Sequence, residues 1–194
     1  MYDYFKGKLV TKAPTHVVLE VAGIGYYLHI SLTTYSQIKD QEECKLYASF
    51  IVREDSHTLY GFATEAERHL FHHLISVSGI GPNTGRMMLS SITPEEIQQA
   101  IIAGQVATIQ KIKGIGPKTA QRVILELQDK LKKQGPDALM PVLINKPSTI
   151  DEALSALVML GFPKQQAEKV LQSLIDPAAE QTVEQLIKAA LKKL

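Results

Sequence analysis

The sequence predicts an α+β multidomain protein, with strands confined to the first third of the chain and helices in the remainder. Three observations favour this class. Apolar residues alternate with a period of two up to residue 63 and follow a helical period from residue 64 onward. A glycine-rich motif occurs twice within the helical part. Residues 135–148 contain three prolines and a glycine and show no periodicity, which is typical of a linker. We expect strands over 1–63, helices over 64–134, a flexible linker over 135–148 and a three-helix bundle over 149–194.

Composition excludes several classes of protein. The 194 residues are 45% hydrophobic and 21% charged, as in ordinary globular domains. No apolar run approaches the ~18 residues of a membrane span, and the first residues do not form a signal peptide, so we expect a cytoplasmic protein without membrane contact. The single cysteine, Cys44, excludes an internal disulfide framework and a cysteine zinc site. Net charge is only +1, but residues 64–134 hold nine Lys and Arg against six Asp and Glu, which favours this region as the binding site for an anionic partner.

Five short strands are predicted before residue 63. Each is rich in β-branched and aromatic residues, and turn sequences at Ala13-Pro14 and Gly23-Ile24-Gly25 interrupt the run. The predicted strands cover residues 5–10, 17–21, 26–30, 46–52 and 58–62. Five strands in about sixty residues are typical of a small closed barrel such as the OB-fold.

Helix start signals mark the change of period. Thr64 and Glu67 have the spacing of a capping box, and Thr93 is followed by a proline and a glutamate three positions later. Thr149 and Glu152 repeat the capping-box spacing after the linker, and Thr182 opens the last predicted helix. These signals predict a helical middle region and a bundle of three helices at the C-terminal end.

The repeated motif carries the chemistry of the chain. Val77-Ser78-Gly79-Ile80-Gly81-Pro82-Asn83-Thr84 recurs 35 residues later as Ile112-Lys113-Gly114-Ile115-Gly116-Pro117-Lys118-Thr119. Glycines two residues apart permit a tight turn and a close approach of the backbone to a ligand. The proline then starts a helix, whose unpaired N–H groups and positive dipole end attract an anion. Two such sites in tandem favour binding of nucleic-acid phosphates without reading of the bases.

Other interpretations of these residues are weaker. A nucleotide-binding P-loop requires Gly-x-x-x-x-Gly-Lys-Ser/Thr after a strand, whereas Pro117 stands directly before Lys118 and the preceding segment is helical. His69 and His73 have metal-compatible spacing, but no third ligand is evident, so we expect surface or packing histidines. We therefore expect no metal, no cofactor and no catalytic residue.

With these motifs, the sequence resembles a known family. The two motifs are similar to tandem helix-hairpin-helix motifs, and the order of barrel, paired hairpins, linker and bundle resembles the RuvA family of Holliday-junction recognition subunits. Val52-Arg53-Glu54-Asp55-Ser56, followed by Leu59-Tyr60-Gly61-Phe62, is similar to the acidic-pin hairpin of that family. The resemblance covers the whole chain and implies an OB-fold barrel, two hairpins and a UBA-like bundle.

The resemblance also implies roles for individual residues. Glu54 and Asp55 would surround the crossover point of the junction in a four-fold homotetramer, although adjacent acids are more commonly solvated turn residues. Phosphates in the junction arms would be held by residues of both motifs. These are Gly79, Gly81, Asn83, Thr84 and Arg86 in the first and Lys111, Lys113, Gly114, Gly116, Lys118, Thr119 and Arg122 in the second. Asn83 stands where the family commonly has a basic residue, so the first hairpin is electrostatically weaker, and Arg86 is a candidate to compensate.

The resemblance further implies protein partners. The chain lacks an ATP-hydrolysing apparatus, and the family recruits the hexameric motor RuvB through its C-terminal bundle and cooperates with the nuclease RuvC. Leu157, Leu160 and Phe162 match the docking face, although bundle cores use the same residue types. Two other functions stay open: a nuclease or glycosylase in which the hairpins position a separate active site, and an architectural protein that binds duplex DNA generally.

Overall fold

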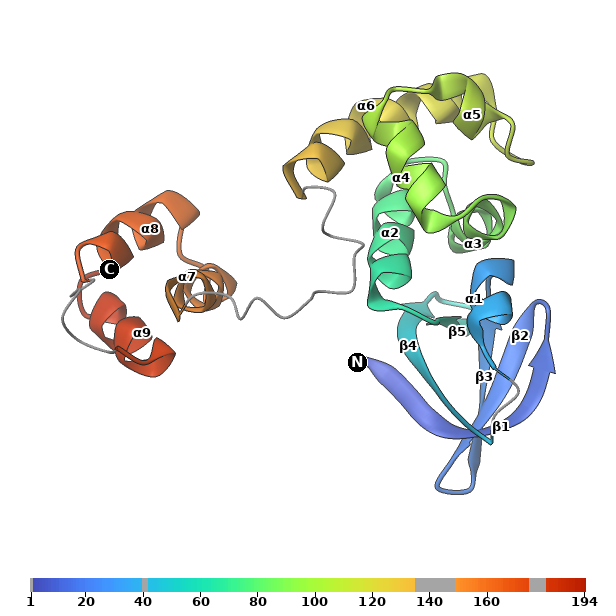
Figure 1. Cartoon of the computed structure of the whole chain (residues 1–194), viewed down its shortest axis with the longest axis horizontal. Coiled ribbons are helices and arrows are strands. Elements are labelled where there is room, and N and C mark those ends of the chain that lie inside the picture. Colours follow the sequence, from blue (N-terminus) through green and yellow to red (C-terminus); the bar gives the residue numbers. More distant parts are fainter. Residues whose placement is uncertain (1, 40–41, 135–148, 175–180) are drawn as a thin grey trace. The chain divides into compact units, whose positions relative to one another are not determined.

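The computed structural model describes residues 2–39, 42–134, 149–174 and 181–194 (Figure 1). They belong to two compact units: one contains the described residues up to 134, and the other contains those from 149 onward. The linker predicted over 135–148 lies outside the described residues.

The first unit begins with a closed five-stranded barrel. The strands are β1 (Tyr4–Ala13), β2 (His16–Val21), β3 (Ile24–Ile30), β4 (Glu43–Val52) and β5 (His57–Phe62). Their order around the barrel is β1-β2-β3-β5-β4, and β1 pairs with β4 to close it. Only β3 and β5 pair in parallel. The predicted OB-fold barrel is therefore confirmed, and alternate residues such as Leu19, Leu28 and Leu46 fill its interior.

A short helix that the sequence pattern did not predict lies between β3 and β4. Helix α1 (Leu32–Gln37) has Ser31 as its N-cap, and the Ser31 hydroxyl accepts a hydrogen bond from the Thr34 amide. Its six residues include two threonines and a serine, which have modest helix propensity, and one and a half turns are too short to show a period. In Figure 1, α1 lies at the end of the barrel that faces the helical region.

The helical region of the first unit continues directly from β5. Its helices are α2 (Glu65–Ser76), α3 (Pro82–Ser91), α4 (Pro94–Ile102), α5 (Val106–Gln110) and α6 (Pro117–Gln134). Thr93 and Glu96 form the predicted capping box at α4. Tyr60 and Phe62 of β5 belong to the hydrophobic core of these helices, so barrel and helices are held together by shared packing.

The second unit is the predicted three-helix bundle. It consists of α7 (Thr149–Met159), α8 (Lys164–Gln172) and α9 (Val183–Leu191), with Thr182 and Gln185 forming a capping box at the start of α9. Its core is small: Ala153, Leu157 and Ala167 are among its six buried residues. The apolar face of each helix is thus buried within the bundle itself.

Candidate nucleic-acid interface

The two glycine motifs adopt the same backbone geometry. Gly79 and Gly114 have φ angles of +95° and +89°, in the left-handed region that favours glycine. One residue later, the amides of Ile80 and Ile115 donate hydrogen bonds of 3.0 and 3.1 Å to the carbonyl oxygens of Val77 and Ile112. Each turn is closed by a backbone hydrogen bond and anchored by buried aliphatic side chains, so the loop is held in one shape.

Each loop leads into a helix that starts with proline. Gly81 is the N-cap of α3 and has no side chain to cap the helix, and Gly116 accepts the corresponding first hydrogen bond of α6 from Ala120. A Cβ atom at Gly81 or Gly116 would meet no other atom within 4 Å, so open space lies in front of both helix starts. The first-turn N–H groups of α3 and α6 therefore face positions that an anion can approach.

The two loops lie next to each other. A Cβ atom placed on Gly79 would lie 3.9 Å from the Thr119 hydroxyl of the second hairpin. The Arg122 guanidinium donates a hydrogen bond of 3.2 Å to the carbonyl oxygen of Ser78 in the first loop and lies 3.8 Å from Glu126. Arg122 thus connects the hairpins as well as placing positive charge between them.

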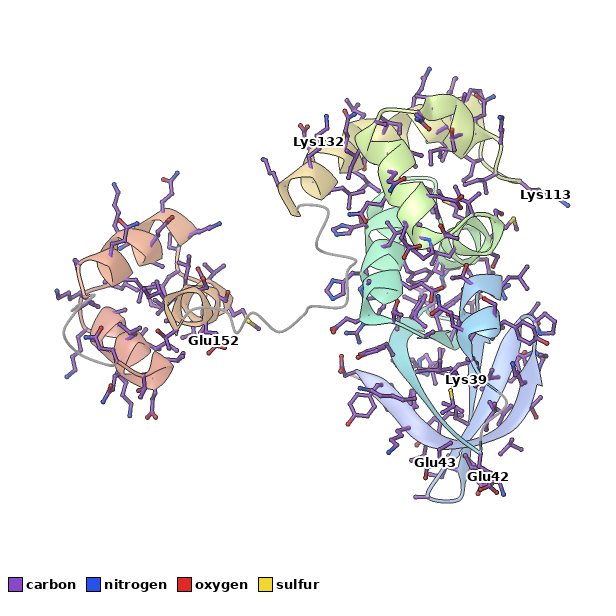
Figure 2. All side chains as sticks on the ribbon, in the orientation of Figure 1. Lys39, Glu42, Glu43, Lys113, Lys132 and Glu152 are labelled. Atoms are coloured by element: carbon purple, nitrogen blue, oxygen red, sulfur yellow. The ribbon has the colours of Figure 1, made fainter. Side chains whose placement is uncertain are left out.

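The second hairpin carries exposed lysines on both sides of its loop. Lys111 ends α5, Lys113 lies in the loop, and Lys118 is in the first turn of α6; all three are exposed. Figure 2 shows the Lys113 side chain extending outward from this loop. Flexible ammonium groups around a helix N-terminus provide charge for phosphate contacts without base specificity.

The first hairpin is organised differently. Asn83, the counterpart of Lys118, accepts a hydrogen bond of 3.3 Å from the Tyr60 hydroxyl of β5. Burial raises the pKa of Tyr60, which keeps this hydroxyl protonated as a donor. Arg86 donates to the carbonyl oxygens of Thr15 and Ile30 in the barrel, at 3.1 and 3.4 Å. Its guanidinium therefore binds the barrel, whereas the sequence suggested it as compensation for Asn83.

Arg53 is a basic residue near the first hairpin that the sequence pattern did not single out. It lines a polar hollow of about 280 Å³ together with residues of β5 and the start of α3. The other lining residues are Ile51, Ser56, Thr58, Tyr60, Gly81, Pro82, Asn83 and Thr84. The only sequence signal for Arg53 is its place directly before the two acids of the proposed pin.

The proposed pin is the turn between β4 and β5. Val52 pairs with His57, and the amide of Arg53 donates a 2.8 Å hydrogen bond to the carbonyl oxygen of Ser56. Glu54 and Asp55 lie at the tip and are exposed to solvent, with the Ser56 hydroxyl 3.3 Å from Asp55. The barrel therefore presents two carboxylates on a short, tied turn that also borders the hollow at the first hairpin.

Comparison with known proteins agrees with this architecture. Residues 1–61 match the RuvA N terminal domain, residues 71–129 match the SAM-like helix-hairpin-helix tandem, and residues 148–194 match the C-terminal domain of RuvA. The Holliday junction branch migration complex subunit RuvA of Christiangramia forsetii is 54% identical over 196 residues and aligns along the full length of both chains. The chain belongs to the RuvA family. Proteins with the same name from Flavobacterium psychrophilum and Bacteroides thetaiotaomicron are 50% and 42% identical, again over all of both chains.

The bundle that matches the RuvA C-terminal domain has an exposed apolar patch. Leu160 is 61% exposed and Met159 is 89% exposed at the end of α7, while Phe162 packs partly against the core. Leu157, the third residue selected from the sequence, is completely buried in the bundle core. Of the three selected residues, Leu160 and Phe162 therefore retain surface, and Met159 is an exposed neighbour that the sequence motif did not include.

The clustered histidines of the first unit make hydrogen bonds and packing contacts. The described part of the chain contains no group of three His, Cys, Asp or Glu side chains that could hold a metal ion. Of the clustered histidines, His72 lies 2.9 Å from the Ser49 hydroxyl, and burial together with Arg68 lowers its pKa. Among the residues that the structure describes, no helix is long and apolar enough to cross a membrane.

Proposed function

We propose that this chain binds four-way (Holliday) junction DNA as the DNA-recognition subunit of a branch-migration complex. The observation that carries the proposal is the combination of two loops of equal geometry with an acidic turn in one compact unit. The loops provide phosphate contacts on two adjacent helix N-termini. The glycines, Thr84, Thr119 and the exposed lysines are the contacts we assign to DNA.

A four-fold homotetramer would place four copies of Glu54 and Asp55 around the crossover point. Carboxylates repel phosphates, so this arrangement keeps the backbones apart at the centre and guides separated strands into new pairs. It also disfavours an uninterrupted duplex, whose phosphates would pass over the pin. One tetramer, or two that face each other, would hold the junction open and nearly square-planar.

The chain would contribute binding and no catalysis. Its relatives are named as subunits of the branch migration complex. We assign ATP hydrolysis to a RuvB hexamer that docks on the C-terminal bundle near Leu160 and Phe162, and junction cleavage to RuvC. The complex would act in homologous recombination and DNA repair, in the bacterial cytoplasm at the nucleoid.

A gel-shift titration of a synthetic four-way junction against a linear duplex of equal length and composition tests the proposal. We expect a preference for the junction of about 100-fold, or about 2.7 kcal/mol, and a steep decrease of affinity with added salt. Equal affinity for both DNAs would favour the architectural, duplex-binding function. No binding by the folded protein to either DNA would refute a nucleic-acid function.

A further inference from the structure

A buried carboxylate joins the barrel to the first hairpin. Glu67, in the first turn of α2, is only 1% exposed. Its spacing from Thr64 predicts a capping box, and the Glu67 amide does donate to the Thr64 hydroxyl at 3.1 Å. The Glu67 side chain, however, turns toward α1 instead of the Thr64 amide.

Two buried hydroxyl groups hold the Glu67 carboxylate. Ser31 Oγ donates to Oε1 at 2.5 Å and Thr34 Oγ1 donates to Oε2 at 2.6 Å. Each hydroxyl also accepts a backbone N–H: Ser31 from Thr34 at 2.9 Å, and Thr34 from Ala63 at 3.2 Å. Both carboxylate oxygens accept a hydrogen bond from a hydroxyl group. Glutamine at this position has a single terminal oxygen and could accept only one of these two bonds.

The network lies where the pin strand becomes the hairpin helix. β5 ends at Phe62 and α2 begins at Glu65, so only Ala63 and the N-cap Thr64 separate them. Ala63 donates its N–H to Thr34, and Glu67 binds α1 one turn further along α2. Because β5 starts at the pin and α2 ends at the first glycine loop, this joint lies on the path of the chain from the pin to the loop.

Other contacts cross the same boundary and hold the fold without Glu67. Arg68 forms a 2.6 Å ion pair with Asp3 at the start of the chain. Thr33 donates to the carbonyl oxygen of Leu89 in α3 at 2.6 Å, and the Ser90 hydroxyl accepts the Leu32 amide at 3.1 Å. With the shared hydrophobic core, we expect these contacts to keep a Glu67 variant folded.

We propose that Glu67 is a positioning residue for junction recognition: bound by Ser31 and Thr34, it fixes the first hairpin relative to the pin and so sets the preference for a four-way junction over duplex. This inference rests on the proposed function. Duplex DNA needs only the hairpins, which Arg122 and Ser78 connect, whereas the junction must fit pin and hairpins together. A loose joint therefore weakens junction binding selectively.

The test measures junction and duplex affinities of the full chain carrying Glu67→Gln. Glu20→Gln is the matched control, because it makes the same chemical change at an exposed residue of β2. Thr34→Val is a second test variant, since it removes one donor to Glu67 and the acceptor for Ala63 while keeping the carboxylate. Thermal melts followed by circular dichroism report whether each variant is folded.

We expect Glu67→Gln and Thr34→Val to bind the junction about threefold to tenfold more weakly, with duplex affinity unchanged within about twofold. Glu20→Gln should behave like the parent chain. A uniform decrease for both DNAs, or an unchanged junction preference in a folded variant, would overturn the inference. A parent chain that shows no junction preference would instead refute the proposed function, so the two failures are distinguishable.

Discussion

Charged side chains of the first unit have roles that their sequence neighbours do not reveal. Glu67, Arg86 and Arg122 each bind groups that are more than thirty residues away along the chain. The sequence predicts that Glu67 caps its own helix, and the family resemblance implies a phosphate contact for Arg86, which stays a prediction. The Glu67 carboxylate binds distant hydroxyl groups because the fold buries it, and a buried polar atom without a partner is costly. The contacts of Arg86 and Arg122 with carbonyl oxygens are exposed or partly buried.

The protonation of Glu67 gives a prediction at this scale. Burial raises its pKa, and Glu95 adds to the rise, while the Ser31 and Thr34 hydroxyls and the Ala63 amide oppose it. Above about pH 4.3 Glu67 loses its proton in the unfolded chain but keeps it in the folded chain. The contribution of Glu67 to the free energy of unfolding therefore falls as pH rises, until Glu67 has also ionised in the folded chain. We expect the difference in melting temperature between the two chains, parent minus Glu67→Gln variant, to decrease from about pH 4 upward.

Thermal melts between pH 4 and pH 8 measure this difference. The Glu20→Gln variant serves as the control, and its difference from the parent chain should show no such decrease. A difference that instead grows with pH would mean that the network lowers the pKa of Glu67 more than burial raises it.

At the scale of single elements, the hairpins were predictable because their signals are local. Glycines at fixed spacing, a proline at the helix start and buried aliphatic residues on both sides occur within eight residues. The structure gives both copies left-handed glycines and the same closing hydrogen bond. Helix α1 was not predicted because the contacts that stabilise it, such as that of Thr33 with Leu89, are tertiary and leave no local signal.

The start of α6 gives a prediction for the proposed DNA contacts. Lys118→Ala should weaken binding to junction and duplex alike, about threefold to tenfold and regardless of sequence, because the contact we propose is to phosphate. The slope of log affinity against log salt should fall by about one for each subunit in contact with DNA, since each such subunit neutralises one fewer phosphate. Titrations at several salt concentrations, with two DNA sequences, measure both effects.

Lys130→Ala is the matched control for this experiment. Lys130 is exposed on the same helix, twelve residues or about 18 Å from Lys118. We expect it to change affinity little. A decrease with Lys118→Ala that depended on DNA sequence would contradict recognition through phosphate alone.

At the scale of the whole first unit, the position of the pin relative to the hairpins is the decisive feature. Arg53 and Ser56 of the pin turn line the same hollow as Gly81 and Asn83 of the first hairpin. In the proposed function the barrel and the hairpin region therefore bind DNA together, although the sequence predicts them as separate domains. The second unit, with Leu160 and Met159 exposed, offers a distinct surface for a protein partner.

Neutralising the pin tests this arrangement. Glu54→Gln combined with Asp55→Asn should leave junction affinity within about twofold, raise duplex affinity severalfold and change the rate of branch migration, because repulsion at the crossover is removed. Gel shifts and a strand-exchange assay with the motor subunit measure these outcomes. A nuclease would instead lose cleavage, and an architectural protein would be indifferent.

Glu42→Gln with Glu43→Gln is the control for the pin variant. Glu42 and Glu43 lie at the start of β4 (Figure 2). The pin follows the other end of this strand, ten residues or about 30 Å along it. The pair makes the same change of charge, and the exposed contact of Glu43 with Lys6 contributes little. Equal effects of the two double variants would indicate a response to net charge and would contradict a role for the pin.

Elements with local signals could be predicted without the structure: the alternating strands, the capped helices, the two glycine loops and the order of the parts along the chain. Their stability depends on neighbours a few residues away, so a pattern of short range was sufficient. Which distant residues meet became known from the tertiary structure alone. It closed the barrel through β1 and β4, directed Glu67 to Ser31 and Thr34, and placed Arg53 and Asn83 on the wall of one hollow. Those pairings follow from burial and from the need of each buried polar group for a partner, and neither is visible in a short window of sequence.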